Sequence, residues 1–101
     1  MTTTQPAKSR RQKLEAFLVS RPGDAFALYG LALECAREGD HDAAIANFET
    51  LLAAHPDYVA GYFQLGQLFA RLARIADSRR VLTEGVAAAV RAGDAHAESE
   101  I

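Results

Sequence analysis

The chain has 101 residues, of which half are hydrophobic and about a quarter are charged, and its formal net charge is −2. This length allows a single domain, and the composition favours a folded globular chain over a disordered one. No apolar run is long enough to span a membrane, and the first residues lack the apolar stretch of a secretory signal. The single cysteine excludes an internal disulfide, so we expect a cytoplasmic protein, and the Ala- and Arg-rich composition suggests a bacterial one.

The hydrophobic pattern predicts helices throughout and no strands. Residues 1–7 are polar and are expected to be disordered. The segment 8–21 then places Leu14 and Phe17 at helical spacing, and Pro22 marks the end of this leading helix.

The next two predicted helices cover residues 24–38 and 41–54. Asp24 and Asp40 stand where an N-cap is needed, because an aspartate side chain accepts hydrogen bonds from the free amides of the first turn. Gly39 is suited to the left-handed conformation that ends a helix.

Two more long helices are predicted over 58–72 and 75–91. Ala73 lies between them at the place of Gly39, and a positive φ at an alanine costs up to about 1 kcal/mol. Gly93 is expected to end the second of these helices, so that 94–101 forms one further short helix.

The chain contains an internal repeat. Pro22 and Pro56 are 34 residues apart, and the helical pattern after the first proline recurs after the second. A period of this length indicates helical units that bury a core against one another. Large and small residues both stay in phase in the aligned pairs, which are Leu28 with Tyr62, Leu31 with Leu65, Ala32 with Gly66, Cys35 with Phe69, Ala44 with Ser78, and Phe48 with Leu82. The small members of these pairs are expected where two helices cross closely.

These residues resemble the tetratricopeptide repeat, most clearly in the stretch Tyr62-Phe-Gln-Leu-Gly-Gln-Leu-Phe69. Gly85 and Val90 depart from the pattern, where alanine and proline are usual. The resemblance implies an all-α, right-handed solenoid of helical hairpins with five long helices and a short C-terminal one. Its expected parts are a capping helix over 8–21, repeat 1 over 22–57, repeat 2 over 58–93 and a cap or tail over 94–101, within one domain spanning 8–101.

No residue pattern predicts catalysis, a cofactor or a metal site. His41, His55 and His96 lack the spacing of metal ligands, and Cys35 falls in a predicted core stripe. We therefore expect a protein that is not an enzyme.

The resemblance implies a protein-interaction module whose first helix in each repeat lines a concave groove for a peptide or helix. The groove positions carried over from the family are Phe26, Tyr29, Leu33, Arg37, Phe63, Gln64, Gln67 and Arg71. The Lys, Asn and Arg residues that grip a C-terminal carboxylate in one subgroup are absent from these positions. In the alternative to an open groove, the leading helix packs over Phe26 and Tyr29.

The predicted partner is another protein, and no membrane contact is expected. An alternative function is a self-associating structural module, with a homo-oligomer formed through the groove or the repeat ends. Contact of nucleic acid with the basic run Lys8–Lys13 is the least favoured alternative, since the aromatic residues fall at core spacing.

Overall fold

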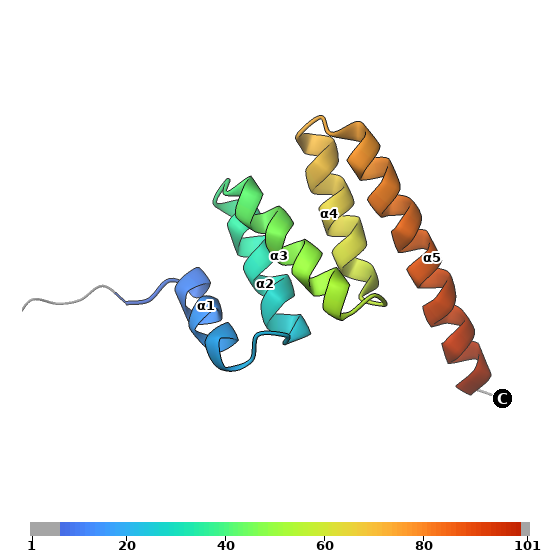
Figure 1. The fold of residues 1–101 in the computed structure, drawn as a ribbon, viewed down its shortest axis with the longest axis horizontal. Helices are drawn as coiled ribbons and strands as arrows, with labels where there is room; N and C mark the ends of the chain where they lie inside the picture. The colour runs from blue at the N-terminus through green and yellow to red at the C-terminus, as the bar shows by residue number, and fades with distance from the viewer. Residues whose placement is uncertain (1–6, 100–101) are drawn as a thin grey trace, which may run out of the picture.

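The computed structural model describes the backbone of residues 7–99 and the side chains of residues 7–93. Its elements are α1 (Arg10–Ser20), α2 (Ala25–Arg37), α3 (His41–Ala54), α4 (Val59–Arg71) and α5 (Ile75–Ser99), and residues 7–99 contain no strand. The helices succeed one another across an elongated body of 65 × 37 × 17 Å (Figure 1). The all-α expectation is therefore confirmed, whereas most of the segment expected to be disordered lies outside the described residues.

The helix starts follow from local side-chain chemistry. Asp24 and Asp40 are N-caps as predicted, and their carboxylates accept hydrogen bonds from the amides of Ala27 at 2.9 Å and Ala43 at 3.3 Å. The start of α1 has a capping box that the sequence analysis did not predict. The side chain of Ser9 accepts from the amide of Gln12, and the side chain of Gln12 accepts from the amide of Ser9.

The two hairpin turns have the same geometry although their sequences differ. Gly39 and Ala73 both adopt positive φ angles, of 80° and 60°. In each turn the amide of the following residue donates to a carbonyl five residues earlier. Asp40 donates to Cys35 at 2.9 Å, and Arg74 donates to Phe69 at 2.8 Å. The repeat thus imposes the left-handed conformation on an alanine, as the alignment of these turns predicted.

The expected separate helix over 94–101 is wrong, because α5 continues without a break from Ile75 to Ser99. A glycine inside a helix costs only about 1 kcal/mol, and no proline follows Gly93 to remove a backbone donor. The alanine-rich run Ala87–Ala89 before Gly93 favours helix, so Gly93 lies inside α5 and does not end it.

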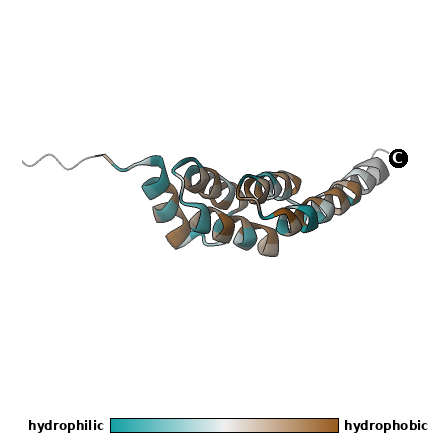
Figure 2. Cartoon of the chain, turned by 90° about the horizontal axis from the view of Figure 1, so that it is seen from above, coloured by the Kyte–Doolittle hydropathy of each residue, from teal (hydrophilic) through white to brown (hydrophobic). Residues whose placement is uncertain are grey.

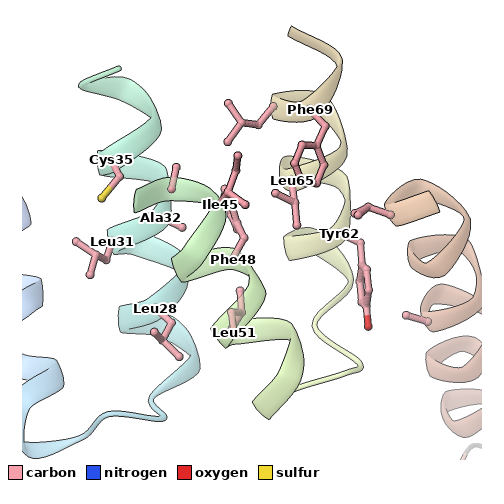
Figure 3. Packing of buried hydrophobic residues seen from close by; sticks show 14 residues of the cluster. Leu28, Leu31, Ala32, Cys35, Ile45, Phe48, Leu51, Tyr62, Leu65 and Phe69 are labelled. Carbon is pink, nitrogen blue, oxygen red and sulfur yellow. The ribbon is translucent and has the colours of Figure 1, made fainter. Parts of the chain in front are cut away.

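The core is assembled from equivalent faces of consecutive helices. Leu31 and Cys35 from α2, Phe48 from α3, and Leu65 and Phe69 from α4 are all at most 5% exposed. Figure 3 shows Ile45 and Phe48 of α3 beside Leu65 of α4 at the boundary between the two repeats, while Leu31 and Cys35 of α2 lie on the side of that helix toward α1. Neither hairpin encloses this cluster alone, so the two repeats stabilise each other.

The second hairpin closes through small residues. A Cβ atom added to Gly66 of α4 would lie 2.5 Å from Leu82 Cδ2, and one added to Gly85 of α5 would lie 2.7 Å from Tyr62 Cβ. The buried hydroxyl of Ser78 donates to the Gly66 carbonyl at 2.8 Å, which satisfies both groups. Gly85, where the resemblance implies an alanine, accommodates the bulk of Tyr62.

Gly66→Ala is expected to destabilise the fold by about 1–3 kcal/mol, because Leu82 and the α5 backbone must move to admit the methyl group. The matched control is Gly93→Ala in α5, where nothing lies within 4 Å of the added atom. That change should stabilise by about 0.5–1 kcal/mol through helix propensity. Urea denaturation of both variants measures the effects, and equal stabilities would contradict the close crossing.

Ala73→Gly is expected to stabilise the chain by about 0.5–1 kcal/mol, because glycine adopts the φ of 60° without strain. The same substitution at the exposed Ala87, inside α5, should instead destabilise by about 0.5–1 kcal/mol. Thermal unfolding followed by circular dichroism distinguishes the two, and a loss of stability at position 73 would show that the turn does not require this conformation.

Candidate functional site

Helices α2 and α4 carry matching sets of residues at the predicted groove positions. On each helix an aromatic residue is followed after four residues by a leucine or glutamine and after four more by an arginine, a spacing that keeps all three on one side. We call this surface the α2–α4 face. It comprises Tyr29, Leu33 and Arg37 on α2, and Phe63, Gln67 and Arg71 on α4.

Tyr29 is half-buried at the junction of the two repeats. Its ring lies 5.2 Å from that of Tyr58, which precedes α4, and meets the edge of Phe48 in the core at 6.4 Å between centroids. Leu33, one turn further along α2, also packs partly against the core. Tyr29 and Leu33 of the α2 half are therefore held in place by packing within the domain.

Tyr58 was missed by sequence reasoning, which took it as the start of a helix. Its ring extends the aromatic surface from Tyr29 toward α4, and burial raises the pKa of its hydroxyl. The available signal was its place directly after the turn that joins the repeats, where a side chain can contact both hairpins.

The α4 half of the face is more accessible. Phe63 is 37% exposed, and its ring lies 3.7 Å from where a Cβ at Gly85 would be, so it also borders α5. Gln67 and Arg71 are exposed, whereas Gln64 is half-buried. Among the side chains that the structure describes, Arg71 has no ion-pair partner.

Arg37 differs from its counterpart on α4 in having an acidic neighbour. Its guanidinium donates to the carboxylate of Glu34 at 2.6 Å, within the same helix. The two arginines of the α2–α4 face are therefore not electrostatically equivalent, and Arg71 is the one left available to an acidic group from outside.

Phe26 lies apart from the other predicted residues. It is 74% exposed and lines a hollow of about 480 Å³ between α1 and α2, which it shares with Leu14, Phe17 and Ala27. The alternative in which the leading helix packs partly over Phe26 and Tyr29 does not hold for Phe26, because α1 leaves most of this ring open to solvent.

A charge cluster joins α1 to the C-terminal end of α2. Arg11 of α1 donates to carboxylates of Glu38 and Asp40 at 3.0 Å each. This ion pair ties α1 to the turn between α2 and α3 and holds the pKa of Asp40 below its ordinary value. The cluster joins one guanidinium to carboxylates of two elements and has a structural role.

The described part of the chain shows no arrangement suited to chemistry. Cys35 is fully buried, and burial raises the pKa of its thiol, which disfavours the nucleophilic thiolate. Within the residues described, no three His, Cys, Asp or Glu side chains converge on a point that would hold a metal ion. No helix in that part of the chain is long and apolar enough to cross a membrane.

Two helical hairpins stacked through a shared core define a helical-repeat protein. The family model described as tetratricopeptide repeat matches residues 36–97, more than half of the chain, so the chain belongs to the tetratricopeptide repeat family. Proteins of this family generally mediate protein–protein interaction or scaffolding and are typically not enzymes. No curated protein matches the chain.

Asp40→Asn is expected to remove part of the acid sensitivity of the fold while keeping the N-cap, since asparagine caps as well as aspartate. The folded pKa of Asp40 lies below the ordinary value of 3.8, chiefly because of the hydrogen bond from Arg11. Its stabilisation is therefore present above pH 3.8 and is lost as the pH falls through the lower, folded pKa.

Thermal unfolding between about pH 6 and pH 2.5 tests this linkage. The variant should unfold at a lower temperature than the wild type at about pH 6, and this difference in unfolding temperature should shrink as the pH falls toward about 2.5. A difference that stays constant across the range would show that the Arg11–Asp40 contact does not contribute.

Proposed function

We propose that this chain is a non-enzymatic adaptor that binds a peptide or helical segment of another protein along the α2–α4 face. The observation that carries the proposal is the repeated aromatic and arginine spacing on two helices that are equivalent by the repeat. Core packing does not account for the exposed members, because Phe63, Gln67 and Arg71 all reach solvent.

The residues of this face suit different parts of a bound peptide. The ring of Phe63 offers an apolar anchor beside the aromatic surface formed by Tyr29 and Tyr58. The amide of Gln67 can both donate to and accept from a peptide backbone. Arg71 is available to an acidic side chain of the ligand, so we expect an amphipathic segment with apolar and acidic residues on one side.

The competing nucleic-acid function is weakened by the partners of the basic residues on α1. Arg10 pairs with Glu34 at 3.3 Å, and Arg11 pairs with Glu38 and Asp40. Arginines already engaged by carboxylates contribute less to phosphate binding. These ion pairs therefore favour a protein ligand over a nucleic acid. The single cysteine supports a location in the cytoplasm.

Selection of a displayed random-peptide library on the purified chain tests the proposal, followed by fluorescence anisotropy of the selected peptides. Phe63→Ala and Arg71→Ala should each weaken binding about tenfold or more, as expected for an interface anchor and a charged contact. The control is Val19→Ala on α1, which shortens an exposed apolar side chain outside the face and should leave affinity unchanged.

The hollow between α1 and α2 is the rival binding site, and Phe17→Ala reports on it. Selected peptides that lose affinity on Phe17→Ala but not on Phe63→Ala or Arg71→Ala would contradict the α2–α4 face. Circular dichroism of each variant confirms that the helices remain folded.

A further inference from the structure

The outward side of α5 carries an apolar stripe that no described residue covers. Ile75, Val86 and Val90 are each 55–57% exposed, and Leu82 between them is half-buried, because part of its side chain packs on Gly66 of α4. We call these four residues the α5 stripe. Part of it lines a shallow hollow of about 370 Å³ formed by α5 residues alone. Figure 2 shows hydrophobic residues recurring along α5 as far as its grey end.

The repeat indicates that this side of α5 is built to pack against a helix. Val86 stands 34 residues after Leu52 of α3, and Leu52 packs closely on α4, with its Cδ2 3.0 Å from where a Cβ at Gly61 would be. Val86, at the centre of the α5 stripe, is therefore the counterpart of a residue that is packed on a neighbouring helix within the chain. The outer face of a terminal repeat is ordinarily polar, which this one is not.

We propose that a second copy of this chain covers the α5 stripe, with two α5 helices packed antiparallel about a two-fold axis at Val86. The stripe residues are spaced by seven, four and four positions, which keeps them on one side of the helix. Antiparallel pairing centred on Val86 sets Val86 against itself and Leu82 against Val90 of the other copy. A surface that matches itself in this way suits a two-fold interface.

The charges along α5 favour the antiparallel direction. Residues 74–83 carry a net charge of +2, whereas residues 84–99 carry −2. Antiparallel packing places each basic half beside the acidic half of the other copy, and it also opposes the two helix dipoles. Docking of the basic half of α5 on the leading segment of another copy is disfavoured, because residues 1–21 carry +4.

The pairing leaves the proposed function undisturbed, since the α5 stripe and the α2–α4 face share no residue. A single helix seam is a small interface, so we expect a reversible dimer with a dissociation constant on the order of 10 µM or weaker. Such a dimer would carry two peptide-binding faces.

Sedimentation velocity of the full chain from about 5 to about 500 µM tests the proposal. The wild type should shift from monomer to dimer, and Val86→Glu should remain monomeric, because two carboxylates would meet at the two-fold axis. Val19→Glu, the same change at an exposed valine of α1, should dimerise like the wild type. A wild type that stays monomeric throughout, or equal dimerisation of the two variants, would overturn the proposal and leave the stripe to a different partner.

Cysteine cross-linking tests the register independently. Oxidation of Val86→Cys should give a covalent dimer, whereas Val90→Cys should not, because the two copies of position 90 would lie about 12 Å apart along the axis. The native Cys35 is buried and does not interfere. Cross-linking of Val90→Cys as rapid as that of Val86→Cys would overturn the proposed alignment.

Discussion

The close crossing of α4 and α5 fixes the orientation of everything that the second repeat presents. Leu82 lies directly over Gly66, and Tyr62 lies over Gly85, so each helix uses a missing side chain to receive a large one from the other. This reciprocal contact sets the rotation of both helices about their axes. As a consequence, Phe63 lies beside the crossing with part of its ring in solvent, while Val86 is turned outward.

The parts of the fold that depend on local chemistry could be predicted from the sequence. Asp24 and Asp40 were recognised as caps because a short carboxylate before an apolar helix has few other uses. The strained turn at Ala73 followed from its alignment with Gly39, and the repeat itself followed from residues of matched size. Each of these inferences needs only neighbouring residues or the period.

Features that depend on contacts between distant helices were not accessible in this way. The pairing of Tyr29 with Tyr58 arises where the two repeats meet, and the position of Phe26 beside Phe17 depends on how α1 docks. The helix α5 continues through Gly93 because the neighbouring residues favour helix. A glycine taken by itself therefore predicted a helix end where there is none. The spacing of the candidate face was therefore predictable, whereas the burial of its members was not.

The way α1 is attached has a consequence for the order in which the domain opens. No residue of α1 is fully buried, and its contacts are half-buried leucines and surface ion pairs on α2. Release of α1 leaves the buried cluster of α2 to α5 in contact with itself, so its opening free energy is a fraction of that of the whole domain. Amide protons of α1 should exchange with solvent well before those of α4, and the two hairpins persist as a folded unit after the first helix has come away.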